Sequence, residues 1–390
     1  MRELREKSCK KREIFKYSNT RKAAICAEHV FDFSLGNPSI PAPKVFTDKL
    51  LSLIESMSPE ALHGYTSGPG DMEVRKKISD YMNKKYGINS VPELIYMTCG
   101  AAASLTVSLT ALVKEGDEVI TLAPFFPEYT VFVEKTGAKL KPVMVRTSDF
   151  QLDTEAFRAS VNENTKAVII NSPNNPTGAV LNEESVKALA SVLKEKEEEF
   201  GHPIYILSDE PYRELVYDTE APFIMNYYDD TVVLYSFSKS LSVPGERIGY
   251  IMVSPKIKEA KDLFFAVCGA GRALGYVCAP ALFQYAVSDC LGVTSDISVY
   301  KKNRDLLTSA LTEYGYEVVK PDGAFYLFVK ALEDDAEQFC ETAKKYELLL
   351  VPSNSFGCTG FVRISYCVST EQIEKSLPSF RKLKEEYDGR

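Results

Sequence analysis

The chain has 390 residues, of which 45% are hydrophobic and 26% charged, and its net charge at pH 7 is −8. This length predicts more than one domain, and the composition is that of an ordinary globular protein. The negative charge argues against a nucleic-acid-binding protein, which usually carries a basic surface. No apolar run reaches the roughly 18 residues of a membrane span, so no membrane partner is expected.

Basic residues gather at the N-terminus between Arg2 and Lys22. The segment has no apolar core and no small-residue cleavage site, so we interpret it as a basic helix or arm rather than a secretory signal. A mitochondrial-type presequence is disfavoured by Glu3, Glu6 and Glu13. Nine cysteines without a C-x-x-C pair predict reduced thiols and a cytoplasmic location. The three histidines lie far apart, so no metal site is expected.

The first elements are predicted from the alternation of apolar and polar residues, from Gly and Pro residues that end an element, and from helix-capping residues. Val30–Leu35 alternates like a strand and is ended by Gly36-Asn37-Pro38. A helix is expected over residues 45–57. A second helix, capped by Asp71, is expected to end near Tyr86.

From residue 94 the pattern becomes strand, turn and helix, repeated several times. This alternation is typical of a mostly parallel sheet with helices on both faces. The expected strands cover residues 94–98, 118–122, 140–145, 167–171, 204–207, 232–235 and 248–253. The expected intervening helices begin near Gly100, Phe125 and Glu183.

The pattern of predicted elements changes after about Ser254. Helices dominate to about Tyr314, and the remainder predicts a separate α+β domain with a helix over residues 335–346. The strand segment around Phe31 has no partner nearby and is expected to complete this domain. The strands expected in the domain cover residues 316–319, 325–329, 348–351 and 361–366.

Chemically useful residues follow the predicted strands. Asn175, Asp209 and Lys239 each lie at the C-terminal end of a separate strand, and Ala101 follows a fourth. Parallel strands present these ends along one edge of a sheet, where ligands bind. An amide, a carboxylate, an amine and a helix N-terminus at that edge suit a phosphorylated, basic heterocyclic aldehyde.

At these residues the chain resembles the fold-type I, class I/II aminotransferases, which use pyridoxal 5′-phosphate (PLP). The motifs are Asn174-Asn175-Pro176-Thr177-Gly178, Ser208-Asp209-Glu210-Pro211-Tyr212, and Ser236-x-x-Lys239 with Arg247 eight residues on. The resemblance runs from Gly36 to Arg363. It implies an α/β fold with a large PLP-binding domain, in which helices sandwich a mostly parallel sheet, a smaller α+β domain, and a homodimer. We therefore predict an N-terminal arm and small-domain segment at 1–44, the large domain at 45–283 and the small domain at 284–390.

The resemblance also implies roles for the residues around the cofactor ring. Lys239 would form the Schiff base and carry the proton between the substrate and the cofactor. Asp209 would pair with the pyridine nitrogen, Tyr212 and Asn175 would bond the phenolic oxygen, and Phe126 would lie over the ring. The ordinary alternatives are a surface lysine at 239, a helix cap at 209, a turn residue at 175 and a core aromatic at 126.

The phosphate would be held, by the same resemblance, from three sides. Backbone groups of a helix N-terminus, two hydroxyls with an arginine, and a tyrosine from the partner subunit would contribute. Many relatives carry Ser or Thr where this chain has alanines, so the alanines here would offer the phosphate only backbone donors. The alternative for the tyrosine is a loop aromatic. These residues are Gly100, Ala101 and Ala102; Ser236, Ser238 and Arg247; and Tyr65.

Two arginines are the candidates for substrate binding. Arg363 lies inside an apolar strand and needs a carboxylate or a cavity. The resemblance assigns it the substrate α-carboxylate, with Gly36 and Asn175 beside it; the alternative is a structural ion pair. Arg272 falls near the place where some relatives have an arginine that reaches the partner subunit's site and binds a substrate side-chain carboxylate. This position favours aspartate or glutamate as the amino donor.

The resemblance thus predicts a PLP-dependent aminotransferase that moves an amino group between an α-amino acid and a 2-keto acid by a ping-pong mechanism. A carbon–sulfur β-lyase on the same fold remains an alternative, because fold and cofactor do not choose the reaction. A non-enzymatic regulator is the third alternative. It is disfavoured because only a short basic segment precedes Phe31.

Overall fold

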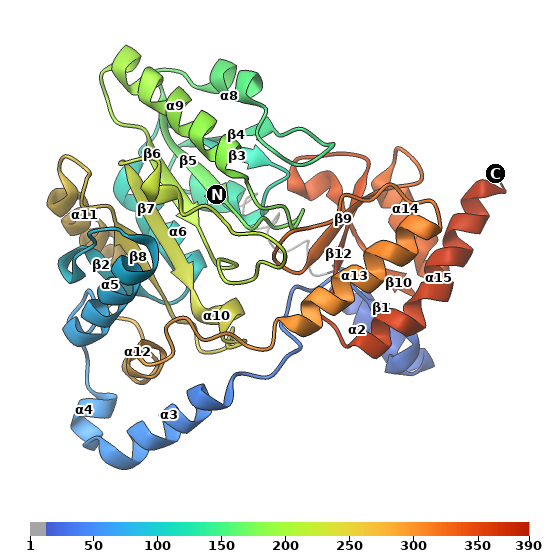
Figure 1. The fold of residues 1–390 in the computed structure, drawn as a ribbon, viewed down its shortest axis with the longest axis horizontal. Coiled ribbons are helices and arrows are strands. Elements are labelled where there is room, and N and C mark those ends of the chain that lie inside the picture. The colour runs from blue at the N-terminus through green and yellow to red at the C-terminus, as the bar shows by residue number, and fades with distance from the viewer. Residues whose placement is uncertain (1–12, 390) are drawn as a thin grey trace.

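The computed structural model describes residues 13–389. It contains two groups of strands with helices packed around each, one at the left of Figure 1 and one at the right. The N-terminal basic segment lies outside the described residues up to residue 12. Its remainder forms α2 (Glu13–Ile25), which packs beside the right-hand group.

The larger sheet has seven strands in the order β2-β8-β7-β6-β5-β3-β4. Strand β8 is antiparallel to both of its neighbours, β2 and β7, and the other pairings are parallel. The prediction of a mostly parallel sheet is therefore confirmed. Its strands are β2 (Ile95–Thr98), β3 (Glu118–Ala123), β4 (Lys139–Met144), β5 (Thr165–Asn171), β6 (Tyr205–Asp209), β7 (Thr231–Ser236) and β8 (Gly249–Val253).

Helices cover both faces of this sheet because successive strand residues point to opposite sides. On β7, Val232 and Leu234 pack with α6, α7 and α11, whereas Val233 and Tyr235 pack with α3, α5 and α12. Helices α8 and α9 extend this second layer over β3 to β6. The bounds are α3 (Lys44–Ser56), α5 (Met72–Tyr86), α6 (Ala101–Leu112), α7 (Glu128–Glu134), α8 (Thr154–Ser160), α9 (Glu183–Phe200), α11 (Ala260–Ala273) and α12 (Ala281–Ser288).

The smaller group forms around a second core. Its three-stranded sheet has the order β11-β12-β9, and β1 pairs in parallel with β10, Phe31 opposite Leu348. The segment around Phe31 thus joins this group, as expected, while the exact domain limits stay a prediction. The elements are β1 (Phe31–Asp32), β9 (Tyr326–Lys330), β10 (Leu348–Leu349), β11 (Val351–Pro352), β12 (Phe361–Ser365), α13 (Ser298–Glu313), α14 (Ala336–Ala343) and α15 (Thr370–Asp388).

Several predicted elements differ from the structure. The strand expected at residues 316–319 is wrong: only Val318 makes an isolated bridge, to Val329. The strand expected at 348–351 divides into β10 and β11, which pair with different partners. Helices α8 and α15 were not predicted, and α15 contains Pro378, a residue that usually ends a helix.

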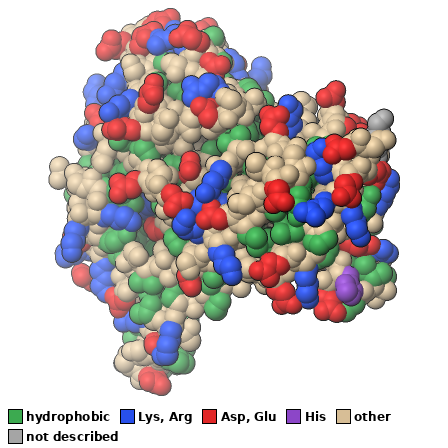
Figure 2. Space-filling model, turned by 45° about the vertical axis from the view of Figure 1, so that its right-hand side comes forward, with side chains coloured by type: hydrophobic (Ala, Val, Ile, Leu, Met, Phe, Trp, Pro, Cys, Tyr) green, Lys and Arg blue, Asp and Glu red, His purple; other side chains and the backbone are tan. Residues whose placement is uncertain are grey.

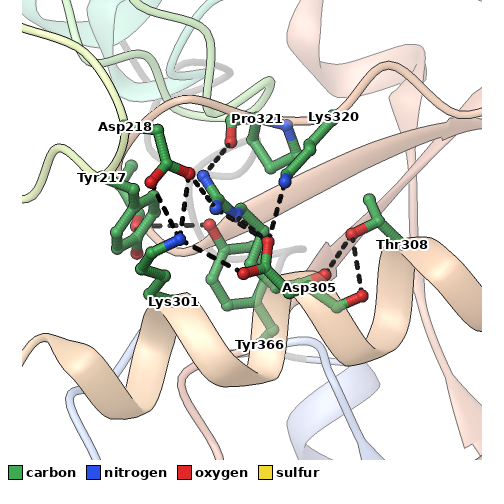
Figure 3. Close-up of polar contacts among 10 residues, drawn as sticks. Tyr217, Asp218, Lys301, Asp305, Thr308, Lys320, Pro321 and Tyr366 are labelled. Carbon is green, nitrogen blue, oxygen red and sulfur yellow. Dashed lines mark hydrogen bonds and ion pairs between the residues drawn. The ribbon is translucent and has the colours of Figure 1, made fainter.

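An ion-pair network joins the two groups (Figure 3). Asp218, in the segment after β6, accepts from Arg304 of α13 at 2.6 Å and pairs with Lys301 at 2.9 Å. Asp305 pairs with Arg304 at 2.7 Å and with Lys320 at 2.9 Å. The Arg304 side chain is only 1% exposed, although both carboxylates are accessible. The network holds α13 against the loop that leaves the larger sheet.

The outer surface is mixed in charge. Figure 2 shows acidic and basic side chains interspersed over one face, with hydrophobic groups between them. Between residues 13 and 389, none of the helices combines the length and apolar character needed to span a bilayer. The same residues contain no group of three or more His, Cys, Asp or Glu side chains arranged to hold a metal ion.

Candidate active site

A cavity of about 750 Å³ lies where the two groups of strands meet. Its wall is built from the C-terminal ends of β5, β6 and β7, the start of α6, and residues of the smaller group. The strand ends are in register, with Asn171 opposite Asp209 and Asp209 opposite Leu234. The predicted residues on the wall are Gly36, Ala101, Ala102, Phe126, Asn175, Asp209, Tyr212, Ser236, Ser238, Lys239, Arg247 and Arg363.

Lys239 projects into this cavity from α10 (Phe237–Ser240), a short helix that follows β7 directly. Its Nζ donates to the carbonyl oxygen of Gly36 at 2.8 Å and lies 5.4 Å from the ring centroid of Phe325. Burial lowers the pKa of Lys239 to about 8, and the charge of Arg247 adds to the shift. The amine is therefore neutral in a larger fraction of molecules than an exposed lysine would be.

Asp209 ends β6 and is 4% exposed. The Tyr129 hydroxyl donates to Oδ2 at 2.5 Å, while Oδ1 has no hydrogen-bond partner among the described residues. Burial raises the pKa of Asp209 to about 7, against the lowering effect of the Tyr129 hydrogen bond. A buried carboxylate oxygen of this kind is costly unless a ligand group pairs with it.

The start of α6 faces a group of donors that suits an anion. Gly100 precedes the helix without a side-chain cap, so the first backbone N–H groups are open to a ligand. Gly100 has φ +87°, and a Cβ there would lie 2.7 Å from Nη2 of Arg247. The Ser236 hydroxyl donates to Ser238 Oγ at 2.8 Å, and Arg247 reaches the same oxygen at 3.4 Å. Helix N–H groups, hydroxyls and a guanidinium together favour phosphate binding.

Arg363 lies in β12 and is buried without a carboxylate partner among the described ion pairs. Its Nη1 donates to Asn175 Oδ1 at 3.0 Å and its Nη2 to the carbonyl of Ser34 at 2.8 Å. Its Nε is buried and has no partner in the described part of the chain. The guanidinium carbon stands 4.8 Å from the Tyr326 ring centroid. Among the described ion pairs, no carboxylate therefore balances the positive charge of this guanidinium at the cavity wall.

Two aromatic side chains complete the predicted wall. The Tyr212 hydroxyl lies 2.9 Å from that of Tyr326, and burial raises the pKa of Tyr212 well above its ordinary value. Phe126 packs edge-on against Tyr129, with ring centroids 5.7 Å apart. Phe126 is partly buried: it lines the cavity and packs against the hydrophobic core behind it.

Two of the predicted residues lie elsewhere in this chain. Tyr65 is 89% exposed, in the loop between α4 (Pro59–His63) and α5. Arg272 is exposed near the end of α11, and neither residue lines the cavity. Gly100 also stays off the wall, although its neighbours Ala101 and Ala102 line it.

Sequence analysis missed other residues of the site. Tyr129 lies near the start of the helix expected to begin near Phe125, three residues after Phe126, so its position was available as a signal. Glu128 lies in the same segment as Tyr129. Tyr326 and Glu337 carry no motif, and only tertiary packing brings them to the cavity wall.

The comparisons agree with this geometry. The sequence profile of the family described as "Aminotransferase class I and II" matches residues 28–380. An aspartate aminotransferase of Thermotoga maritima is 31% identical over 357 residues, covering 90% of each chain. A probable N-acetyl-LL-diaminopimelate aminotransferase of Bacillus subtilis is 32% identical over 380 residues, covering 93% of this chain and 91% of the relative.

Solved structures extend the similarity to three dimensions. An amino transferase from Eubacterium rectale superimposes with a TM-score of 0.95 at 52% identity, over 97% of this chain and 96% of that one. The aspartate aminotransferase of Thermus thermophilus with maleate gives a TM-score of 0.85 at 25% identity, over 96% of each chain. The confirmed fold and the profile match together identify a transferase. The chain belongs to the class I and II aminotransferases, a family whose members depend on PLP.

Proposed function

We propose that the protein transfers an amino group between an α-amino acid and a 2-keto acid in two half-reactions with ping-pong kinetics. One observation carries this proposal. A single cavity contains the Lys239 amine, with a pKa of about 8, and the Asp209 carboxylate, with one open buried oxygen. A nucleophilic amine and an acid for a ring nitrogen are what the PLP reaction requires.

The residues on the wall fit the cofactor. Lys239 would attach to its aldehyde, and the open Oδ1 of Asp209 would accept from the ring nitrogen. The start of α6 at Ala101 and Ala102 would hold the phosphate, together with the hydroxyls of Ser236 and Ser238 and the charge of Arg247. The bound cofactor supplies an electron sink for the bond broken at the substrate α-carbon.

The remaining wall residues would orient the ring. The Tyr212 hydroxyl and the Asn175 amide are proposed to bond its phenolic oxygen. Phe126 is proposed to cover one face, because it lies partly exposed on the cavity wall. Together these contacts would orient the ring relative to the Lys239 amine.

Arg363 is proposed to bind the substrate α-carboxylate. Its buried Nε lacks a partner among the described residues, and guanidinium geometry matches a carboxylate in two parallel bonds. Asn175 already contacts Arg363, and Gly36 lies beside Lys239. A substrate held there would place its α-carbon near the Lys239 amine, which would take up and return the proton.

We infer that the working form is a homodimer in which Tyr65 reaches the partner's phosphate site. Tyr65 and apolar side chains of α3, among them Leu51 and Ile54, are exposed in the single chain. In Figure 1, α3 and α4 extend away from the rest of the molecule, where a second copy could cover them.

Mixed dimers test this arrangement. Tyr65→Phe and Lys239→Ala chains, each impaired alone, should regain activity when refolded together. One site of the mixed dimer then combines an intact Lys239 with the partner's intact tyrosine. A mixture no more active than the sum of its parents would show that Tyr65 does not act between subunits.

A preference for aspartate or glutamate depends, in this proposal, on Arg272 of the partner subunit. The reaction rate of the Arg272→Ala variant should then fall far more with acidic donors than with alanine as donor. Equal losses with both donors would remove the preference.

The reaction itself is tested with purified, PLP-loaded protein. An absorbance band that amino donors convert to the amine form of the cofactor, and that a 2-keto acid restores, would support transamination. Pyruvate and ammonia released from cystathionine without a keto acid would instead support the carbon–sulfur lyase. We place the protein in the cytoplasm within this proposal, since every described cysteine is a free thiol.

A further inference from the structure

Tyr326 joins the two groups of strands at the cavity. It is the first residue of β9, in the smaller group, and it lines the cavity wall. Its hydroxyl oxygen lies 2.9 Å from that of Tyr212, which comes from the loop after β6 in the larger group. Both side chains are buried, and in the described part of the chain neither hydroxyl makes another hydrogen bond. The proposed function gives a role to Tyr212 but none to Tyr326.

Three contacts fix the position of the Tyr326 side chain. Its ring lies against the Arg363 guanidinium, with 4.8 Å between the guanidinium carbon and the ring centroid. The same ring packs edge-on against Tyr212, with the two centroids 5.7 Å apart. The Tyr326 hydroxyl lies against the backbone of Gly36, where an added Cβ would stand 2.0 Å from the hydroxyl oxygen. The side chain is thus held between residues that are assigned to the cofactor and residues that are assigned to the substrate.

The direction of the bond between the two hydroxyls decides what Tyr212 can do. The distance alone allows either hydroxyl to be the donor. A hydroxyl has one proton, so Tyr212 can donate to the phenolic oxygen of the cofactor only if it accepts from Tyr326. Burial raises the pKa of Tyr326 to about 12, and the charge of Arg363 opposes this rise. Since a nearby cation makes a hydroxyl more acidic, Arg363 favours Tyr326 as the donor.

We propose that Tyr326 is a positioning residue, whose hydroxyl donates to Tyr212 and so directs the Tyr212 proton to the phenolic oxygen of the cofactor. The inference rests on the proposed function, because Tyr212 must bond that oxygen. In a chain of hydrogen bonds each bond polarises the next, so the Tyr326 hydroxyl strengthens the bond from Tyr212. A hydrogen bond to the phenolic oxygen stabilises its anionic form. It therefore lowers the pH at which half of the bound cofactor has lost its proton, here called the midpoint.

The sign of a spectroscopic shift tests the direction of the bond. Tyr326→Phe removes the hydroxyl and keeps the ring on Arg363. In a pH titration of the absorbance of PLP-loaded protein, this variant should raise the midpoint by about half a pH unit. If Tyr212 instead donates to Tyr326, the same change frees the Tyr212 proton for the cofactor, and the midpoint should fall. A lowered or unchanged midpoint would overturn the proposal.

The matched control is Tyr316→Phe. Tyr316 is a buried tyrosine of the smaller group whose hydroxyl donates to the Phe380 carbonyl at 2.8 Å, and it does not line the cavity. Its loss removes one buried hydroxyl of the same kind, so the midpoint should stay as in the wild type. A rise in this control equal to that of Tyr326→Phe would reduce the effect to a general loosening of the fold and overturn the proposal.

A double variant tests whether the effect passes through Tyr212. Tyr212→Phe should raise the midpoint more than Tyr326→Phe does, because it removes the donor to the phenolic oxygen itself. In protein that already carries Tyr212→Phe, the further change Tyr326→Phe should add no shift. Shifts that add in the double variant would show that Tyr326 acts on the cofactor by another route, and would overturn the assignment.

The absorbance titration also separates this inference from the proposed function. It needs bound PLP but no turnover, so a raised midpoint in Tyr326→Phe supports the inference even if no amino acid converts the cofactor and transamination fails. Conversion by amino donors together with an unchanged midpoint in Tyr326→Phe would overturn the inference alone. If Tyr212→Phe itself leaves the midpoint unchanged, the role given to Tyr212 fails, and the inference about Tyr326 fails with it.

Discussion

The Tyr129 hydroxyl donates to Oδ2 of Asp209 at 2.5 Å, and Oδ1 of the same carboxylate is left without a partner in the described part of the chain. Without its cofactor, the protein must therefore bury a group whose ionised form is poorly compensated. Burial raises the pKa of Asp209 to about 7, above the ordinary value near 4.

We expect Asp209→Asn to stabilise the cofactor-free protein. In the PLP-loaded protein the same change should abolish most of the activity. Below about pH 4 the wild-type carboxyl is protonated in both folded and unfolded chains. As the pH rises to about 7, the unfolded chain releases the proton first, so wild-type stability falls. The variant should gain about 1–3 kcal/mol in free energy of unfolding at pH 8, and less towards pH 4, by urea titration. Its kcat/KM should fall about a thousandfold.

The control for that change is Asp48→Asn, which alters an exposed carboxylate paired with Lys44 at 2.6 Å. Exposed pairs contribute little, so its stability should hardly change. If the Asp209→Asn protein is instead less stable than wild type at pH 8, another group must already neutralise the carboxylate.

The lowered pKa of Lys239 predicts how cofactor-free protein takes up PLP. Only the neutral amine attacks an aldehyde, and burial lowers this pKa to about 8. The rate of attachment should rise about tenfold per pH unit below 8 and level off above it. Stopped-flow absorbance measures the rate. The reference is the amino acid lysine with its α-amino group blocked, so that only its side-chain amine reacts. A rate that keeps rising to pH 10, as with the reference, would contradict the shift.

Arg363→Lys should weaken substrate binding while leaving cofactor binding unchanged. Lysine keeps the charge but loses the planar pair of donors, and it cannot reach both Asn175 and the Ser34 carbonyl. We expect KM for amino donors to rise about tenfold to a hundredfold. Arg381→Lys, the same change on the surface of α15, should leave KM as it was. An unchanged KM in Arg363→Lys would move the α-carboxylate site elsewhere.

The network of Figure 3 predicts a stability effect away from the cavity. Arg304→Met removes the bonds to Asp218 and to the Pro321 carbonyl and the stacking on Tyr217. We expect a loss of about 1–3 kcal/mol in the free energy of unfolding, by urea titration. Lys330→Met, which breaks an exposed pair with Glu317 at 3.0 Å, should cost less than about 0.5 kcal/mol. Similar losses in both variants would show that burial of Arg304 adds nothing.

Much of the large sheet was predictable because its strands are short apolar runs bounded by turn residues. Asn175, Asp209 and Lys239 were placed together because parallel strands end at one edge, and the structure puts all three on one wall. The helix capped by Asp71 was predicted to end near Tyr86, and α5 ends at that residue; at its start, Asp71 accepts from the N–H groups of Glu73 and Val74.

The features of the fold and the site that the sequence did not predict depend on contacts between distant segments. Tyr326 reaches Tyr212 only because β9 and β12 pack against the loop after β6, which no local pattern states. Residues 316–319 have strand-like composition but only one bridge partner, so tertiary context overrides propensity there. Tyr65 and Arg272 stay off the cavity wall of their own chain, and a single sequence carries no information about a second copy.

The pairing of Phe31 with Leu348 has a consequence for biosynthesis. The Phe33 carbonyl accepts from the Ser365 N–H at 3.0 Å, and the Ser34 carbonyl accepts from Arg363. A chain leaving the ribosome therefore carries residues 31–36 without their partners until almost the whole polypeptide has emerged. The part of the wall at Gly36, made first, is the last to be assembled. Nascent chains truncated before residue 348 should thus present this apolar segment to chaperones.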